Sequence, residues 1–318
     1  MTLFSNVVGE KPSRIPNFLR SVNRSIIVSF RVIPDKGLGN CGYVDRSGII
    51  LLDNTSRYAF AVTDPQKNRT EGGFRLRQGA SLTPPLVSII TVVFRAAHEL
   101  PPLLENIVAQ RGEDTELIVV DGGSDDGTLD VLRRYEDSID YWISEPDRGI
   151  YDAMNKGIAV ATGEFILHLN AGDRLLFIPR QELEQSLADN IDVASFAVKT
   201  HRSGTHRPTN GFILRFANTW HHQGTFYRRE RHPGYDTRYR IFADFDLNQR
   251  MTKAGKSVRL SNTVVAEQVS AGVSANMATY REQYNVVRQN FGTPYVYLAH
   301  LWRYFWSAIW ALERWVGK

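Results

Sequence analysis

The sequence has a single cysteine, Cys41, among 318 residues. One cysteine cannot form an intramolecular disulfide and offers no thiolate pair to a zinc ion, so a disulfide-rich secreted scaffold is excluded. Long apolar runs are missing too, since no uncharged stretch approaches the roughly 18 residues that a membrane-spanning helix needs. Residues 1–20 lack an apolar core followed by a small-residue cleavage site, which predicts no secretory signal and a cytoplasmic protein.

Several familiar enzyme motifs are also missing. The first strand of the main domain is followed by Phe94-Arg95-Ala96, where a dinucleotide-binding fold would have G-x-G-x-x-G. The stretch GKS at 255–257 is similar to the end of a P-loop, but the earlier glycine of that loop is Arg250 here. Neither G-x-S-x-G nor H-E-x-x-H occurs. These absences argue against NAD-dependent dehydrogenases, P-loop NTPases, α/β-hydrolases and zinc metalloproteases.

Charge is distributed unevenly along the chain. The net charge of +4 is too small to indicate a nucleic-acid partner. Residues 85–199, however, carry a net charge of −12, and residues 200–260 carry +8. Because like charges repel, an acidic region that binds a phosphorylated ligand needs a divalent cation between them.

The composition changes along the chain and predicts three segments. Residues 1–84 hold short β-like runs at 25–33, 48–53 and 57–62, separated by turn residues. We expect a small β-rich extension there, either a structural collar or a docking module. Residues 85–270 alternate strand-like and helix-like patterns, and an aromatic-rich helical segment follows at 271–318.

The alternating region predicts an α/β fold with a doubly wound, mostly parallel sheet. Four apolar, β-branched runs alternate with three segments of helical spacing, and such crossovers produce parallel strands. In these sheets the ligand lies beyond the carboxyl ends of the strands. The expected strands are 87–94, 116–123, 140–146 and 164–173, and the expected helices are 100–110, 128–135 and 150–161.

Polar side chains stand where the expected strands end. Asp121 ends the second strand, Asp147 follows the third, and Asn170 and Asp173 lie at the end of the fourth. Hydrophobic patterning alone does not require three polar strand ends at one edge. The sequence therefore predicts a binding site there.

Three stretches in this order resemble the family 2 glycosyltransferases. They are VSIITVVFRA, ELIVVDGGSDDGTLDVL and ISEPDRGIYDAMNKGIAVATGEFILHLNAGD, and the resemblance covers about residues 85–250. It implies the GT-A fold, with a donor half at 85–175 and an acceptor half at 176–270. It also implies an inverting enzyme that uses a nucleotide-sugar donor.

The resemblance places donor contacts in DGGSDDGT (121–128) and PDRGIYDAMNKG (146–157). Many relatives have two successive acids in the first motif, and the second of them is Gly122 in this chain. The implied donor-binding residues are Asp121, Gly122, Ser124, Asp147, Arg148, Asn155 and Asn170.

The resemblance also implies a metal ligand and a general base. Relatives commonly end the NAGD motif (170–173) with two aspartates, so Asp173 remains as the ligand for Mn²⁺ or Mg²⁺. Asp244, in ADFDLNQRM, stands in the place of the catalytic base. His222 and Asp246 are assigned to the acceptor side.

The implied reaction moves a sugar to a hydroxyl of a glycan or lipid-linked glycan, in surface polysaccharide biosynthesis. A sugar nucleotidyltransferase is one alternative, although it would need a basic, glycine-rich loop after the first strand. A catalytically silent scaffold that binds nucleotide sugars is the other, since Gly122 and Gly172 replace acids of the family motifs.

The C-terminal stretch 294–318 predicts a helix at a membrane interface. Trp302, Trp306 and Trp310 recur at i, i+4 and i+8 and so share one helix face, while charged residues make the stretch too polar to span a bilayer. We expect peripheral attachment to an anionic inner membrane surface. The alternative is that these aromatic side chains pack on the transferase core.

Overall fold

The computed structural model describes residues 43–44, 50–51, 69–79, 83–200, 204–209, 211–269 and 279–316. The chain divides into two compact units, Met1–Asp64 and Pro65–Lys318. In the first unit β1 (Tyr43–Val44) pairs antiparallel with β2 (Ile50–Leu51). Strand β2 lies inside the expected run 48–53. The expected runs 25–33 and 57–62 lie outside the described residues.

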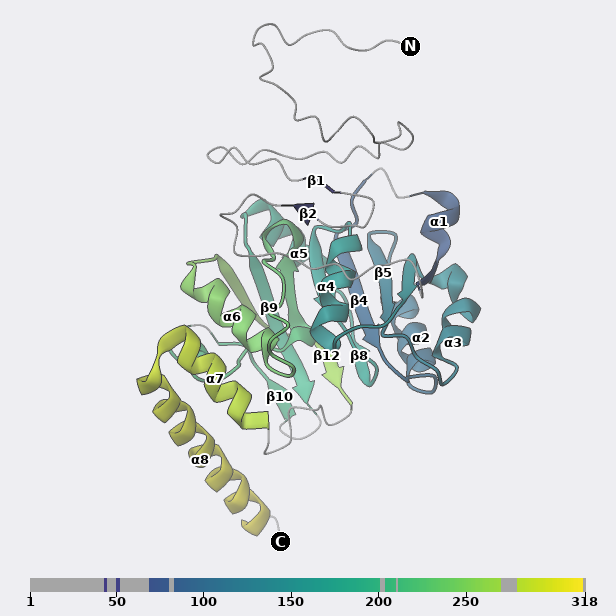
Figure 1. Ribbon diagram of the computed structural model, residues 1–318. Coiled ribbons are helices and arrows are strands. Elements are labelled where there is room, and N and C mark those ends of the chain that lie inside the picture. Colours follow the sequence, from purple (N-terminus) through teal and green to yellow (C-terminus); the bar gives the residue numbers. More distant parts are fainter. Residues whose placement is uncertain are drawn as a thin grey trace, which may run out of the picture. The chain divides into compact units, whose positions relative to one another are not determined.

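The second unit contains a ten-stranded mixed sheet (Figure 1). Its order is β3-β6-β5-β4-β7-β11-β9-β12-β8, and β10 pairs with β9. The strands are β3 (Thr70–Gly72), β4 (Val87–Val93), β5 (Thr115–Asp121), β6 (Tyr141–Ser144), β7 (Phe165–His168), β8 (Asp173–Leu175), β9 (Val193–Thr200), β10 (Gly204–His206), β11 (Thr225–Arg228) and β12 (Val258–Gln268).

The helices connect and cover these strands. The α-helices are α1 (Phe74–Gln78), α2 (Leu100–Gln110), α3 (Thr128–Arg134), α4 (Ile150–Val160), α5 (Arg180–Ala188), α6 (Ala243–Lys253), α7 (Tyr280–Phe291) and α8 (Thr293–Val316). All four expected strands and all three expected helices of the donor half are present. The mostly parallel α/β fold is therefore confirmed, because β4 pairs parallel with β5 on one side and with β7 on the other, and β6 pairs parallel with β5.

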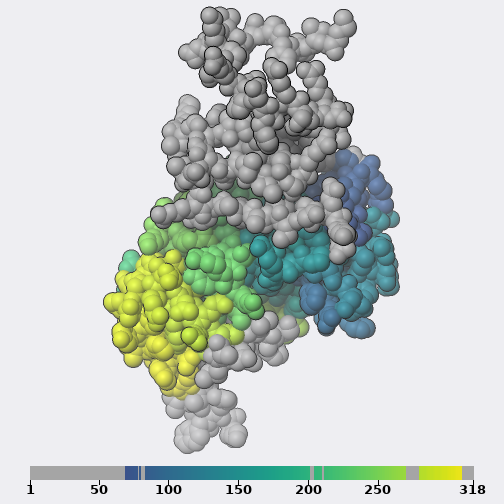
Figure 2. Space-filling view, viewed as in Figure 1, coloured from purple at the N-terminus to yellow at the C-terminus, as the bar shows by residue number. Residues whose placement is uncertain are grey.

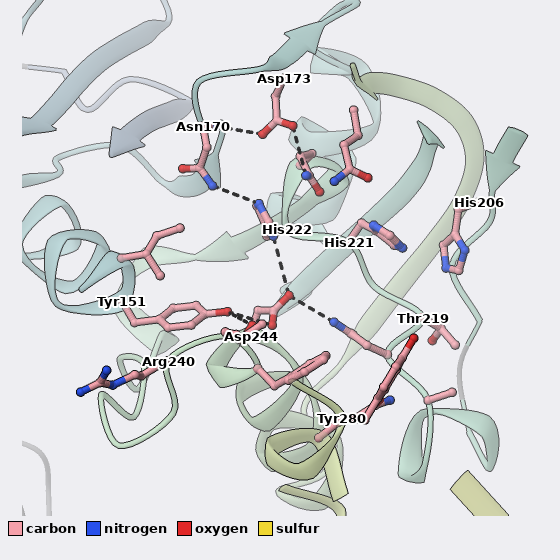
Figure 3. A pocket seen from close by; sticks show the side chains of 18 of the residues that line it. Tyr151, Asn170, Asp173, His206, Thr219, His221, His222, Arg240, Asp244 and Tyr280 are labelled. Carbon is pink, nitrogen blue, oxygen red and sulfur yellow. Dashed lines mark hydrogen bonds and ion pairs between the residues drawn. The ribbon is translucent and has the colours of Figure 1, made fainter. Parts of the chain in front are cut away.

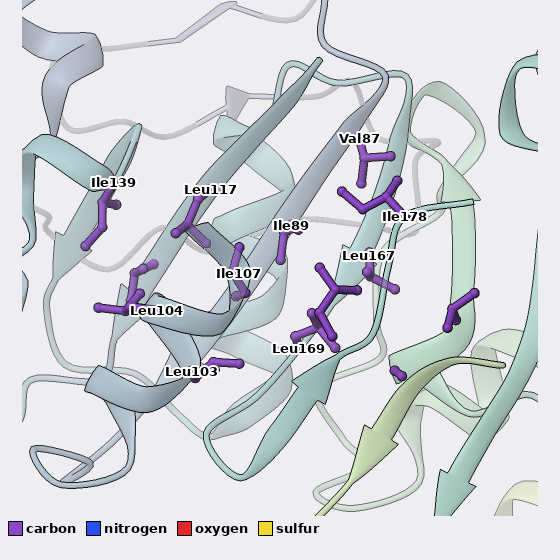
Figure 4. Packing of buried hydrophobic residues seen from close by; sticks show 14 of the residues in the cluster. Val87, Ile89, Leu103, Leu104, Ile107, Leu117, Ile139, Leu167, Leu169 and Ile178 are labelled. Atoms are coloured by element: carbon purple, nitrogen blue, oxygen red, sulfur yellow. The ribbon is translucent and has the colours of Figure 1, made fainter. Parts of the chain in front are cut away.

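Alternate residues of the central strands face opposite sides of the sheet. Ile89 and Leu117 pack with α2 on one side, as Figure 4 shows, whereas Ile90 and Ile118 pack with α4 and α6 on the other. All four are fully buried. A strand that is buried on both faces reads as a continuous apolar run, which explains why the sequence predicted these strands well.

The acceptor half is built differently. Strand β11 lies antiparallel between β7 and β9, so it begins at the edge where β4 to β7 end. Strand β11 is short, and His222–Gly224 forms a 3₁₀ turn directly before it. This turn brings His221 and His222 to the carboxyl edge of the parallel strands.

The C-terminal helices pack on the acceptor half (Figure 2). Val286 and Val287 of α7 pack in the same hydrophobic cluster as the buried residues of α6. In α8 the ring of Trp302 lies 5.7 Å from that of Phe216, in an edge-to-face arrangement. No helix in the described part of the chain is both long enough and apolar enough to cross a membrane.

Candidate active site

One large cleft of about 1480 Å³ runs along the carboxyl edge of the sheet. Its walls come from both halves, because Gly122, Asp147 and Asp173 line it together with His222 and Asp244. Figure 3 shows Asp173, His222 and Asp244 in a row across this cleft. The fold thus brings the predicted metal ligand and the predicted base, which are far apart in the sequence, to one place.

Asp173 contacts two residues, Asn170 and Gln223, whose side chains carry amide oxygens. Its Oδ2 accepts a hydrogen bond from the backbone N–H of Asn170 at 2.9 Å, and its Oδ1 accepts one from Gln223 Nε2 at 3.2 Å. Asn170 Oδ1 and Gln223 Oε1 are buried and have no hydrogen-bond partner among the residues that the structure describes. Burial raises the pKa of Asp173, although His222 and these hydrogen bonds oppose the rise. Mg²⁺ and Mn²⁺ prefer such carboxylate and carbonyl oxygens.

The donor set is nevertheless sparse. The described residues contain no cluster of three or more His, Cys, Asp or Glu side chains that could hold a metal ion. Asp173 supplies a carboxylate, and the amide oxygens of its neighbours Asn170 and Gln223 are the other candidate ligands. These residues fit a cation that takes its remaining ligands from water and substrate phosphates.

His222 connects the two acids across the cleft. Its Nδ1 lies 3.7 Å from Asp244 Oδ2, an ion-pair distance, and its Nε2 lies 3.3 Å from Asn170 Nδ2. Burial by itself lowers the pKa of His222, but the interactions with Asp244 and Asp173 outweigh it and raise the pKa above its usual value. Both acids therefore favour a positive charge on this histidine.

Asp244 lies in the first turn of α6 and is 8% exposed. Asn218 Nδ2 donates to its Oδ2 at 3.1 Å, and Tyr151 Oη lies 3.1 Å from its Oδ1. The backbone N–H of Phe245 also donates to Oδ1 at 2.8 Å. These contacts hold the carboxylate in one orientation at the cleft wall.

A second pair of histidines lies farther along the wall. The rings of His206 and His221 are 4.2 Å apart, and both residues line the cleft. Burial, with smaller contributions from the neighbouring His206 and His222, lowers the pKa of His221 to about 3. This side chain is neutral at physiological pH, so it can contact a substrate without adding charge.

Gly122 and Asp147, two of the predicted donor-binding residues, line the cleft. Asp147 is partly buried, and its Oδ1 accepts the backbone N–H of Gly149 at 2.7 Å. Burial raises the pKa of Asp147, with smaller contributions from the nearby Asp152 and Asp121. The exposed ring of Phe94, at the end of β4, lines the same part of the cleft.

Other predicted donor residues lie near the cleft but do not line it. The Asp121 carboxylate is fully buried and accepts hydrogen bonds from Ser144 Oγ at 2.6 Å and from the backbone of Ser124 at 3.0 Å. Arg148 is exposed and pairs with Asp152 at 3.0 Å. These side chains shape the strand-end turns, and their polar groups are already satisfied within the fold.

The side chains of Asn155 and Asp246 also form hydrogen bonds or ion pairs with other parts of the fold. Asn155 Nδ2 donates to the backbone carbonyl of Tyr235 at 2.9 Å. Asn155 Oδ1 accepts a hydrogen bond from the backbone N–H of Tyr235 at 2.8 Å. Asp246 pairs with Arg250 at 2.7 Å and accepts from Asn290 Nδ2 at 3.0 Å. Neither residue lines the cleft.

Sequence reasoning missed several residues that the structure brings to the site. Tyr151 and Asn218 orient Asp244, and Gln223 contacts Asp173. Gln223 directly follows His221 and His222 in the sequence. Its position next to the predicted acceptor-side residue His222 could have indicated it. Asn218 lies in a loop with no recognisable motif, so only the tertiary structure reveals it.

Comparisons with known proteins agree with this geometry. The family model described as glycosyl transferase family 2 matches residues 88–247. A PGL/p-HBAD biosynthesis glycosyltransferase of Mycobacterium tuberculosis is 32% identical over 218 residues, which cover 62% of this chain and 82% of the relative. A cholesterol galactosyltransferase of Borreliella burgdorferi is 28% identical over 110 residues, or 34% of this chain and 31% of the relative.

Among solved structures, a crystal structure of S. aureus TarS 1–349 in complex with UDP superposes with a TM-score of 0.50 at 16% sequence identity. The superposition covers 64% of each chain and supports the same fold. The family match spans half of the sequence and includes both Asp173 and Asp244. The chain therefore belongs to the family 2 glycosyltransferases.

Proposed function

We propose that this protein transfers a sugar from a nucleoside diphosphate donor to a hydroxyl group, with inversion at the anomeric carbon. The observation that carries the proposal is the row Asp173, His222 and Asp244 across one cleft. An acid that can face the diphosphate and an acid that can face the acceptor then lie on opposite sides of the reacting carbon. A single displacement with inversion needs this arrangement.

In the proposed reaction Asp244 is the general base. The acceptor hydroxyl gives its proton to the Asp244 carboxylate, and its oxygen bonds to the anomeric carbon. The bond from that carbon to the diphosphate oxygen breaks, and the nucleoside diphosphate leaves with the electron pair. Proton removal of this kind contributes typically 10²- to 10⁴-fold to a rate. His222, beside Asp244, keeps the carboxylate oriented.

A divalent cation, Mn²⁺ or Mg²⁺, belongs to this proposal. Asp173 would hold it, together with the amide oxygens of Asn170 and Gln223 that lack other partners. When bound, such a cation neutralises the charge that develops on the departing diphosphate. Residues 85–199 carry a net charge of −12, so the cation would offset the repulsion between this acidic region and a diphosphate.

The acceptor end of the cleft favours an amphipathic acceptor, such as a lipid-linked glycan. The cleft continues from Asp244 to Trp302 and Trp306 of α8, and Arg240 and Arg303 also line it. Neither arginine forms an ion pair with an acid of the described residues. Aromatic rings suit apolar groups or sugar faces, and guanidinium groups suit phosphate. The relative named as a cholesterol galactosyltransferase supports a lipid hydroxyl as acceptor.

The same helix supports peripheral attachment to an anionic membrane surface. The side chains of Tyr297, Leu301, Tyr304 and Phe305 on α8 are all more than half exposed. Aromatic side chains beside basic residues favour the headgroup region of a bilayer. A membrane-bound acceptor would then reach the cleft from the surface to which α8 attaches.

The test is a transfer assay with the full chain and Mn²⁺. UDP-, GDP- and dTDP-sugars are offered together with short-chain alkyl glycosides, and products are identified by mass spectrometry and by the anomeric proton coupling in NMR. We expect a glycoside of inverted configuration with one donor class. A product of retained configuration would refute the single displacement, and the absence of any donor-dependent product would refute the transferase reaction.

A further inference from the structure

Two segments that are far apart in the sequence form an apolar part of the cleft, which we call the apolar slot. The loop between β10 and β11 and the helix α8 each contribute three apolar side chains. All but the last of the six pack in one hydrophobic cluster, and the ring of the last lies 5.8 Å from that of Trp302. The six are Ile213, Phe216, Ala217, Ala299, Trp302 and Trp306.

The loop side of the apolar slot is held in place by two helices. The fully buried Gln249 of α6 donates from Nε2 to the backbone carbonyls of Leu214 and Arg215, at 3.2 Å and 3.0 Å. The Arg215 guanidinium donates to Tyr295 Oη on α8 at 2.7 Å. The two walls are thus connected to each other and to the core. A ligand can bind between them without the entropy cost of ordering a loop.

Small side chains make room between aromatic rings in this slot. Ala217 and Ala299 line the cleft although they are only 8% and 4% exposed, so they form the floor of the slot. The rings of Phe216 and Trp302 lie beside them, 5.7 Å apart. Apart from the Trp302 indole N–H, these four side chains offer no hydrogen-bond donor or acceptor. A sugar bound here would lose its hydrogen bonds to water without replacement, whereas an apolar group would lose none.

The apolar slot begins next to the predicted base. Ala217 directly precedes Asn218, whose Nδ2 donates to Asp244 Oδ2 at 3.1 Å. Asn218 Oδ1 in turn accepts from Asn248 Nδ2 at 3.0 Å, which fixes this side chain in the cleft wall. Successive Cα atoms lie about 3.8 Å apart. A hydroxyl at Asp244 and an apolar group at Ala217 therefore belong to one molecule with few atoms between them.

Polar side chains of α7 and α8 also line the cleft. They are Tyr280, Gln283, Arg303 and Ser307. The guanidinium of Arg303 lies 4.3 Å from the centre of the Tyr280 ring. These groups suit the polar parts of an acceptor and leave the apolar slot for its apolar part.

We propose that the apolar slot binds the apolar body of an acceptor alcohol, whose reactive hydroxyl is on that body or on a first sugar attached to it. This inference rests on the proposed function and narrows its acceptor. The hydroxyl loses its proton to Asp244 and bonds to the anomeric carbon, as in the proposed reaction. The enzyme therefore acts at the start of a glycolipid and does not extend a long glycan.

Acceptors that differ only in the distance between hydroxyl and alkyl chain test this inference. Octyl glucoside, octyl maltoside and octyl maltotrioside move the same terminal glucosyl group stepwise away from the chain, and 1-octanol and maltotriose complete the set. The full chain is assayed with Mn²⁺ and UDP-, GDP- and dTDP-sugars, each alkyl acceptor below its micelle-forming concentration. We expect kcat/KM to fall about tenfold or more from the glucoside to the maltotrioside, because each methylene that leaves the slot costs up to about fourfold.

The other outcomes separate this inference from the proposed function. Equal kcat/KM for the three octyl glycosides, or transfer to maltotriose alone, would overturn the inference and leave the transferase reaction intact. No transfer to any of the five acceptors with any donor would refute the transferase reaction itself.

Variants that narrow the floor of the slot identify the residues responsible. Ala217→Leu and Ala299→Leu add bulk from opposite walls, so we expect each to lower the ratio of kcat/KM for octyl glucoside to that for butyl glucoside about tenfold. The ratio compares two acceptors in one protein, so a smaller folded fraction does not change it. The control is Ala159→Leu, at an exposed position of α4 outside the cleft, which should keep the wild-type ratio. An unchanged ratio in both narrowed variants would refute the slot.

Enlarging the slot should have the opposite effect. Phe216→Ala removes a wall ring, and we expect the ratio of kcat/KM for decyl glucoside to that for octyl glucoside to rise about fivefold, since two more methylenes can be buried. The affinity for the nucleoside diphosphate of the active donor, measured by calorimetry, should stay at the wild-type value. A loss of donor affinity without a change in the ratio would mean that Phe216 only supports the fold, and would contradict its place in the slot.

Discussion

Two neighbouring regions of this protein contain the same kinds of polar residue in opposite states. At the cleft edge of the sheet, Asp147, Asp173 and Asp244 present carboxylates to a large cavity. Directly behind that edge, Asp121 and Asp246 are buried and fully engaged in hydrogen bonds or ion pairs. The type of a residue and its position near the end of a strand or helix therefore do not by themselves identify a candidate functional residue. What distinguishes the two regions is whether the fold has already satisfied the side chain.

The largest effect should come from removing the cation at the cleft edge. We expect EDTA treatment to abolish sugar transfer and added Mn²⁺ to restore it, because Asp173 and the diphosphate are both negatively charged and repel each other without a cation between them. Asp173→Asn should behave like the chelated enzyme, measured as turnover over a range of Mn²⁺ concentrations. Transfer at the full rate after complete chelation would remove both the cation and this role for Asp173.

The second largest effect is expected at Asp244, which lies two residues from Asp246 on α6. Asp244→Asn should lower kcat by 10²- to 10⁴-fold, since an amide cannot take the proton of the acceptor. Donor affinity, measured by calorimetry, should change little. Wild-type turnover in this variant would exclude Asp244 as the base and would weaken the contrast with Asp246.

Asp246→Asn should act on stability instead. The change removes the ion pair with Arg250, and we expect it to lower the free energy of unfolding by about 1.5–3 kcal/mol, the usual range for a hydrogen bond to a charged group. Urea denaturation measures this loss, and turnover per folded molecule is the companion measurement. A large loss of turnover without a loss of stability would move Asp246 into the cleft-edge group.

Two histidines extend the comparison to pH. His222 lies in the cleft, whereas His232 lies behind it, where burial and then the charge of Arg250 lower its pKa to about 3. The unfolded chain binds a proton near pH 6.5, so this group costs stability as the pH falls from 6.5 towards 3. At pH 5 the cost is about 2 kcal/mol, at 1.36 kcal/mol for each pH unit.

His232→Asn, which keeps an acceptor for the backbone N–H of Gly234, should make stability less sensitive to acid. The measurement is the difference in unfolding free energy between pH 7 and pH 5, for the wild type and the variant. The same difference in both proteins would mean that His232 is not the group that responds.

The smallest effect concerns the two faces of α8. Trp302 packs on Phe216, while Tyr304 and Phe305 are 64% and 58% exposed. Replacing Tyr304 and Phe305 with serine should reduce flotation with anionic liposomes by about tenfold, because each ring would bury apolar area at the interface. Leu76→Ser, at an exposed leucine of α1, is the control and should float like the wild type. Equal flotation of all three proteins would favour packing as the main role of this helix.

The donor half was predictable because its contacts are local in the sequence. The runs that became β4 to β7 are buried on both faces, and the βαβ connections between them leave few possible topologies. The expected strand-end site followed from this order, and Gly122, Asp147, Asn170 and Asp173 do line one cleft. The acceptor half has antiparallel and long-range pairings, so the sequence indicated its helix at Asp244 but not the path of β11.

By itself the sequence determined the class of fold, the family and the edge of the sheet where the cleft lies, because apolar periodicity and ordered motifs are local properties. Only the tertiary structure decided which polar groups are available there. Asp147 lies just before α4 and Asn155 lies within it. The Asn155 amide is hydrogen-bonded to the Tyr235 backbone, whereas one carboxylate oxygen of Asp147 has no hydrogen-bond partner among the described residues. Such a difference depends on partners about 80 residues away in the chain, and a buried polar group has to be satisfied by whatever the fold places beside it.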